Sequence, residues 1–285
     1  DKFILDFGVD QSNTIAGSSV QPFENNFPLA SGSADDFVAT WAGATYRAEF
    51  WSATGRVEYR NADSGERFGI LAGLYREETA GHGFSAGLQI FGDKPAAGGR
   101  TTLSDLRLNW AFRPDMSRWI LFDRLDLIYE EQHLGNLDQR SWKVVNNLNA
   151  NWKPTLDTQF SFQYGVKYVR SNYSDTKYTG FTDLFGLDMR RDIDSEWDWG
   201  LHASALHSWE SKVIKYGLGV DVGHMVAKNA WLSIGYNLVG FHDSDFSAAR
   251  YTAQGPFIKF RIKLDQDSLK DWFKQGLKQA ATGLR

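Results

Sequence analysis

The residues best suited to acid–base chemistry are the six histidines and a few clustered carboxylates. His242 is followed by Asp243 and Asp245, at the end of an expected strand and beside a long polar loop. A carboxylate that orients an imidazole is a common acid–base pair, so this is the best candidate for a hydrolase site. No second carboxylate partner is identifiable, and such residues are ordinary in exposed loops. We therefore expect no catalytic residues and no enzyme activity.

The sequence also gives little indication of a metal site or a nucleotide site. None of the histidines has metal-ligand spacing, and the chain has no Cys, which excludes disulfides and thiolate sites. Asp192, Asp194 and Glu196 alternate within one turn and would attract calcium, although solvated turn carboxylates are far commoner. Nucleophile-elbow and phosphate-loop motifs are absent. We expect no metal and no cofactor.

Residues 197–241 indicate which elements position the polar groups. Three consecutive segments alternate with strict period two, which is typical of β-strands. The second segment has only apolar or aromatic side chains on one face, namely Ile214, Tyr216, Leu218, Val220 and Val222. Soluble strands are about 5–6 residues long, whereas about 9–11 residues cross a bilayer with tilt. An apolar face opposite a small, polar face predicts a transmembrane β-barrel.

The composition agrees with a barrel and excludes other classes. Aromatic residues make up 15% of the 285 residues, yet the mean hydropathy is -0.42. No run of about 18 apolar residues exists, so a transmembrane helix is excluded, whereas a barrel needs only alternate apolar residues. The net charge of -4 and the pI of about 5.9 give no support to nucleic-acid binding.

The periodic segments predict an all-β fold, an antiparallel up-and-down barrel of about 14 strands, with 12–14 plausible. Residues 1–265 form this barrel, and residues 10–36 form a long loop or plug. Short turns at 114–117, 154–157, 192–196 and 227–230 alternate with longer connections such as 92–99, 171–179 and 242–254. Short periplasmic turns that alternate with longer exterior loops are expected of outer-membrane barrels.

Residues 266–285 change to a helical period and predict a C-terminal amphipathic helix. This helix would plug the lumen, lie on the inner leaflet or bind a periplasmic partner. Its apolar face would hold Leu269, Trp272, Phe273 and Leu277.

Two sets of residues are assigned to the barrel wall. Aromatic residues that directly follow short turns would form an interfacial girdle: Trp119, Phe160, Trp197, Trp199 and Trp231. Charged residues on the opposite parity would line the lumen: Arg56, Glu58, Arg107, Arg124, Asp126, Lys143, Lys167, Arg190, Lys259, Arg261 and Lys263. Lumen cations would favour anions in a pore, or salt bridges would fill and rigidify the interior. Both interpretations remain open from the sequence.

The closing segment carries a family resemblance. Gly255, Ile258 and Phe260 resemble the last-strand insertion signal of outer-membrane barrels. Residues 237–241, 251–257 and 263–267 resemble the C-terminal barrel module of large Gram-negative repeat-containing surface proteins, as do residues 146–152. The resemblance implies an outer-membrane anchor or conduit that is joined to upstream domains.

The expected function is therefore a membrane anchor or translocation pore of a larger cell-envelope or surface assembly in the bacterial outer membrane. Expected partners are outer-membrane lipid and lipopolysaccharide, the barrel-assembly machinery and periplasmic or surface domains of the same assembly, and no nucleic acid. The alternative is a general diffusion or anion-preferring porin. An outer-membrane hydrolase and a soluble β-sandwich binding protein fit the sequence less well.

Overall fold

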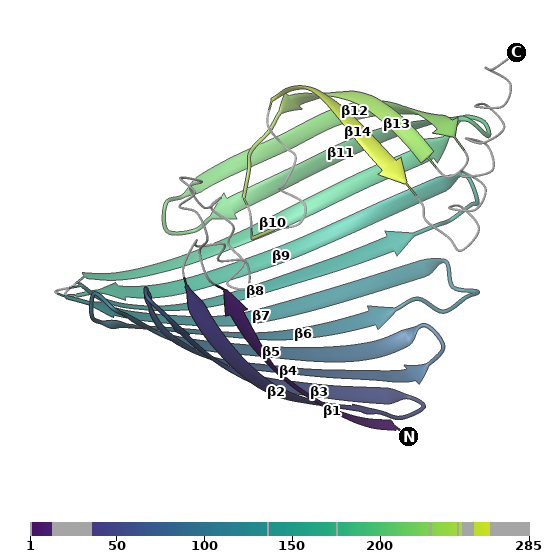
Figure 1. Cartoon of the computed structure of the whole chain (residues 1–285). Helices are drawn as coiled ribbons and strands as arrows, with labels where there is room; N and C mark the ends of the chain where they lie inside the picture. The colour runs from purple at the N-terminus through teal and green to yellow at the C-terminus, as the bar shows by residue number, and fades with distance from the viewer. Residues whose placement is uncertain are drawn as a thin grey trace, which may run out of the picture. The chain divides into compact units, whose positions relative to one another are not determined.

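The computed structural model describes residues 2–12, 36–135, 137–174, 176–227, 230–243, 245–246 and 254–262. Within these ranges fourteen antiparallel strands form one sheet and follow one another in chain order (Figure 1). The predicted all-β, up-and-down architecture and its strand number are therefore confirmed. Among the described residues, no helix is long and apolar enough to cross a membrane.

The strands are long throughout, and all but the last have ten residues or more. The first seven are β1 (Lys2–Ser12), β2 (Phe37–Arg47), β3 (Trp51–Ala62), β4 (Gly65–Thr79), β5 (His82–Pro95), β6 (Arg100–Phe112) and β7 (Trp119–Leu134). The second seven are β8 (Leu137–Trp152), β9 (Thr158–Tyr173), β10 (Thr176–Asp192), β11 (Trp197–Ser208), β12 (Val213–Ala227), β13 (Ala230–Val239) and β14 (Gly255–Ile262).

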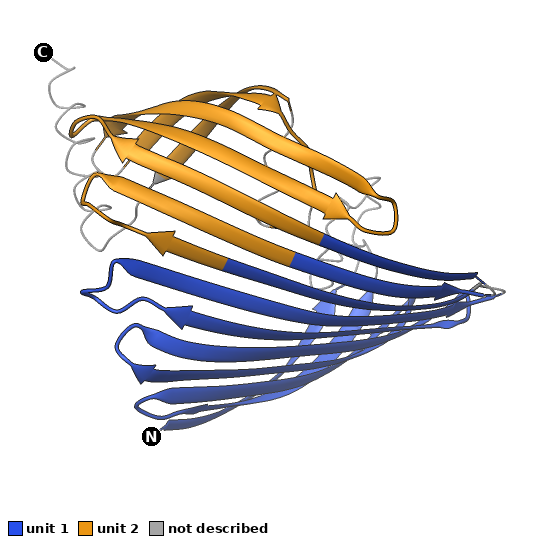
Figure 2. Ribbon diagram, turned by 180° about the vertical axis from the view of Figure 1, so that it is seen from behind, with its two compact units in different colours: residues 1–148, 166–182 blue, residues 149–165, 183–285 orange. Residues whose placement is uncertain are grey.

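The chain divides into two compact units, shown in blue and orange in Figure 2. Unit 1 holds residues 1–148 and 166–182, and unit 2 holds residues 149–165 and 183–285. Unit 2 contains an apolar cluster in which Phe241 and Phe246, from the segment after β13, pack with Leu184 of β10 and Leu206 of β11. Phe246 is fully buried there.

The two faces of the strands have opposite character, and β12 shows this most clearly. Val220 and Val222 are 47% and 48% exposed, whereas Asp221 between them is 5% exposed. Gly217 and Gly219 are also buried, on the face of Asp221. Apolar side chains of a soluble protein point into its core, so this inverted arrangement is that of strands with a lipid-facing apolar side.

Some connections are much shorter than the sequence predicted. The expected loop at 171–179 is wrong, because β9 reaches Tyr173 and β10 starts at Thr176. The connection between β7 and β8 is equally short, because β7 reaches Leu134 and β8 starts at Leu137. Gly135 and Ser174 have φ of 59° and 48°, the left-handed conformation that tight hairpin turns require. Polar residues suggested loops here, but they belong to paired strands.

Other predictions fall on undescribed residues. The C-terminal helix at 266–285 and Lys263 lie outside the described residues. So does most of the predicted loop at 10–36, although β1 extends to Ser12 and thus beyond the expected strand end.

Candidate functional site on the two faces of the sheet

Aromatic side chains mark two heights on the apolar face of unit 1. Trp119 begins β7, and Tyr129 follows ten positions later on the same face. Tyr129 contacts Trp142 of β8 with 4.5 Å between ring centroids. Ten residues at about 3.3 Å each span about 33 Å along the strand. At about 40° tilt this becomes about 25 Å, the height of the apolar band of outer-membrane barrels.

Strand β8 repeats the ten-residue spacing between Trp142 and Trp152. Beyond Tyr129 the outer parts of β7 and β8 become charged, where Glu131 forms ion pairs with His133 and Arg140 at 3.0 and 2.9 Å. On both strands, the aromatic residues therefore lie at the boundary between an apolar stretch and a charged stretch that suits contact with water.

The structure places two of the five predicted girdle residues beside other rings. Phe160 stacks on Trp152 with 5.7 Å between centroids, and Trp197 lies 4.3 Å from His224. Trp199 shares the face of Trp197 by the period of two. Trp231 differs, since the alternation of β13 puts it on the face of Ser233 and Asn237.

Arg261 lies over the Trp231 ring at 5.1 Å, so this tryptophan contacts a cation on the polar face.

Sequence reasoning missed an aromatic cluster near the turn at 80–81, where the Trp110 indole N–H donates to His82 Nε2 at 2.8 Å. Phe112 packs edge-on against the same imidazole. The alternation of Trp110 and Phe112 on one face of β6 was its only signal in the sequence.

One polar pair interrupts the apolar face of unit 1. Asn146 of β8 donates to Asp123 of β7 at 2.7 Å and also to the backbone carbonyl of Arg124 at 3.2 Å. Asp123 lies four positions after Trp119, within the band that the aromatic residues define. The amide therefore satisfies a carboxylate that would otherwise face an apolar environment alone.

Ion pairs within and between strands lie on the polar face of unit 1. Arg56 pairs with Glu58 at 2.6 Å. Arg107 reaches Asp126 at 2.9 Å and Asp105 at 3.2 Å. Arg124 also binds Asp126 at 2.8 Å, so this carboxylate, with only 7% of its side chain exposed, accepts from two guanidinium groups.

A second ion-pair network lies on the polar face of unit 2. Arg190 of β10 binds Asp198 of β11 through one terminal nitrogen and Asp221 of β12, at 2.7 Å, through the other. Arg261 of β14 binds the second oxygen of Asp198 at 2.9 Å. Both carboxylates are 4% exposed, so the network joins four strands through nearly buried charges.

The structure thus brings together most of the charged residues predicted for the lumen. By the alternation of side chains, Lys143, Lys167 and Lys259 also lie on the polar face of their strands. Sequence reasoning assigned no role to Asp198 and Asp221, the partners of Arg190. Their only signal in the sequence was that each is a charged residue on the small, polar face of a strand whose other face is apolar.

The carboxylates considered for catalysis and for calcium binding accept hydrogen bonds from the backbone of their own turns. Asp243 accepts the backbone N–H of Asp245 at 3.0 Å, as a turn-closing carboxylate does. Asp194 accepts the backbone N–H groups of Glu196 and Trp197, both at 2.8 Å. In the part of the chain that the structure describes, no group of three or more His, Cys, Asp or Glu residues is arranged to hold a metal ion.

The Asp194 turn predicts a pH-dependent contribution to stability. The two backbone N–H donors lower the pKa of Asp194, because they favour the charged carboxylate. A lowered folded-state pKa stabilises the fold above the unfolded pKa of about 3.9, and this stabilisation is lost as the pH falls through the folded value. We expect Asp194→Asn to lower the urea midpoint more at pH 6 than at pH 3. If Asp194→Asn lowered the urea midpoint equally at both pH values, this prediction would be contradicted. The control is Asp115→Asn in the turn at 113–118.

Comparisons with known proteins bear on the fold. No family model and no curated protein matches the chain. The siderophore receptor PirA from Acinetobacter baumannii is similar in structure, with a TM-score of 0.56 and 8% identity over 71% of this chain. The chain spans 40% of the length of that receptor. The Vibrio cholerae outer membrane protein OmpT, in its trimer form, matches with 9% identity over 93% of this chain and 96% of its own.

The TM-score of the OmpT match is 0.38. The PirA match and the fourteen-stranded antiparallel sheet together show that this chain has the fold of an outer-membrane β-barrel.

Proposed function

We propose that this chain is the membrane-embedded barrel of a larger cell-envelope assembly, which it serves as an anchor or translocation conduit in the bacterial outer membrane. One observation carries the proposal. All five arginines predicted for the lumen have a carboxylate partner within ion-pairing distance: Arg56, Arg107, Arg124, Arg190 and Arg261. A wall with compensated charges supports a rigid scaffold better than a field that draws in anions.

The aromatic heights support the membrane part of the proposal. The band between Trp119 and Tyr129 faces lipid, and the charged ends of β7 and β8 beyond Tyr129 face the exterior leaflet with its lipopolysaccharide. Periplasmic or surface domains of the same assembly and the barrel-assembly machinery are the proposed partners. Residues 1–265 are the proposed barrel and residues 266–285 a proposed separate helix. We assign the chain no catalytic role, since Asp243 closes a turn.

The second candidate is an anion-preferring porin. Lys143, Lys167 and Lys259 favour it, because they lie on the polar face of their strands and cationic side chains in a narrow pore attract anions. The two candidates differ in ion selectivity, which depends on net lumen charge, and not in fold.

Single-channel recording under a salt gradient separates the two functions. For a compensated wall we expect either silence or a conductance with weak ion selectivity. Combined replacement of Lys143, Lys167 and Lys259 by Gln is expected to change the reversal potential little. Strong anion selectivity that this triple variant abolishes would contradict the proposal and establish the porin. Heat-dependent gel mobility verifies in each case that the protein is folded before insertion.

A further inference from the structure

The polar face of unit 1 has a hollow of about 280 Å³ on strands β3 to β6. A water takes up about 30 Å³ in the liquid, so the hollow has room for about nine waters. Ligand pockets for drug-sized molecules start at about 300 Å³, so the hollow suits a small solute such as a single sugar ring.

The strand register explains why the hollow exists. Thr54, Gly73, Gly87 and Arg107 are consecutive partners across β3, β4, β5 and β6, and so form one row on the polar face. The two central members have no side chain. A Cβ built at Gly87 would meet nothing within 4 Å, and one at Gly73 would only touch the Thr54 methyl at 3.5 Å. The neighbouring glycines therefore leave a gap between Thr54 and Arg107.

Polar side chains of the adjacent rows line this gap. Gln89 and Asp105 are cross-strand partners on one side, and Ser85 and Asn109 are partners on the other. The Asn109 amide donates to Ser85 Oγ at 3.0 Å. The hollow thus presents hydroxyl, amide and carboxylate groups from strands β5 and β6.

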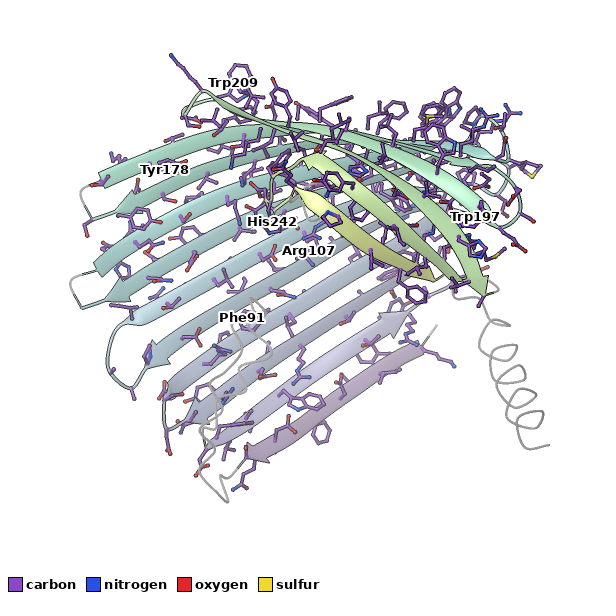
Figure 3. The ribbon with its side chains drawn as sticks, turned by 90° about the horizontal axis from the view of Figure 1, so that it is seen from above. Phe91, Arg107, Tyr178, Trp197, Trp209 and His242 are labelled. Carbon is purple, nitrogen blue, oxygen red and sulfur yellow. The ribbon has the colours of Figure 1, made fainter. Side chains whose placement is uncertain are left out.

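Asp105 has an incomplete hydrogen-bond set. Its Oδ2 accepts from Arg107 at 3.2 Å, and the same guanidinium binds Asp126 through Nε. Its Oδ1 is buried and has no hydrogen-bond partner within the described ranges. This oxygen is closed to solvent, whereas the Asp105 side chain as a whole is 19% exposed, so a solute in the hollow meets the rest of the carboxylate. Arg107, labelled in Figure 3, also lines the hollow.

We propose that the hollow binds a neutral, hydroxyl-rich solute, one sugar ring in size. A sugar hydroxyl both donates and accepts, so it can pair with the exposed part of the Asp105 carboxylate, the Gln89 amide and the Thr54 hydroxyl. The charges of Asp105 and Arg107 balance, which disfavours both an anion and a cation. Leu71 adds an aliphatic wall for the C–H groups of the ring. The site goes beyond the proposed function, and its binding test requires only folded protein in detergent.

The test is titration calorimetry with D-glucose, using glucose 6-phosphate and glucosamine as charged probes. We expect glucose to bind more tightly than either. Gly87→Val fills the gap and is expected to weaken glucose binding at least tenfold. Asp105→Asn keeps the shape but replaces one acceptor oxygen with an amide donor and removes the charge that balances Arg107, and a similar loss is expected. Gly55→Val is the control, because Gly55 lies on the apolar face of β3 and its Cβ would also meet nothing within 4 Å.

Three results would overturn the site. The first is the absence of any heat of glucose binding in a sample whose gel mobility shows that the protein is folded. The second is tighter binding of glucose 6-phosphate than of glucose. The third is equal glucose affinity in wild type and in Gly87→Val. None of them depends on whether the barrel conducts ions, so this proposal and the proposed function fail separately.

Discussion

Replacement of Arg190 by Met is expected to destabilise the protein by about 3–5 kcal/mol, because it leaves buried carboxylates without a counter-charge. The guanidinium of Arg190 holds Asp198 and Asp221, whose side chains are 4% exposed. Arg261 still reaches Asp198 in such a variant, but no second salt bridge holds Asp221 in the described part of unit 2. The cost comes from an unpaired buried charge and not from lost attraction alone.

The measurement is the midpoint of urea unfolding in detergent or lipid, followed by the fluorescence of the eleven tryptophans. Arg191→Met is the matched control, since it removes the same side chain from the next, exposed position of β10. Adding Asp221→Asn to Arg190→Met is expected to restore part of the stability. Equal midpoints for Arg190→Met and Arg191→Met would show that the network contributes nothing.

Two equally exposed isoleucines give the second large prediction. Ile234 of β13 is 62% exposed on the apolar face, and Ile193 is 64% exposed in the turn at 193–196. In water, an arginine would be tolerated at either position. An arginine that faces the bilayer midplane costs about 2–4 kcal/mol, whereas near the interface the cost falls to about 0–1. We therefore expect Ile234→Arg to be strongly destabilising and Ile193→Arg to be nearly neutral.

Refolding into vesicles at increasing urea concentration measures both variants against wild type. A loss confined to Ile234→Arg supports a lipid-facing strand. If the two arginines have the same small effect, the apolar face of β13 does not contact lipid.

The alternation of side chains made the fold predictable. In β12 the period of two alone separates Val220 and Val222 from Asp221, and the structure shows the same division in their exposure. The ends of strands were less predictable, because polar residues suit both a loop and the water-exposed part of a long hairpin. The loop predicted at 171–179 failed for this reason.

Features that depend on strand register could not be predicted from the sequence. Gly73 and Gly87 are separated by an entire hairpin, and only their pairing creates a hollow. Asp198 and Asp221 meet one arginine because β10, β11 and β12 are neighbours in the sheet. Trp231 looked like a girdle residue by its distance from a turn, yet the parity of β13 puts it with Arg261.

A cysteine scan along β12 tests most directly whether the apolar face meets lipid. The chain has no native Cys, so each single-cysteine variant carries one label without background. An environment-sensitive fluorophore would be placed in turn at positions 217–222 and exposed to lipid-borne and aqueous quenchers. We predict lipid quenching at Leu218, Val220 and Val222 and none at Gly217, Gly219 and Asp221. Aqueous quenching of all six positions, or the absence of a period of two, would contradict the membrane-spanning barrel.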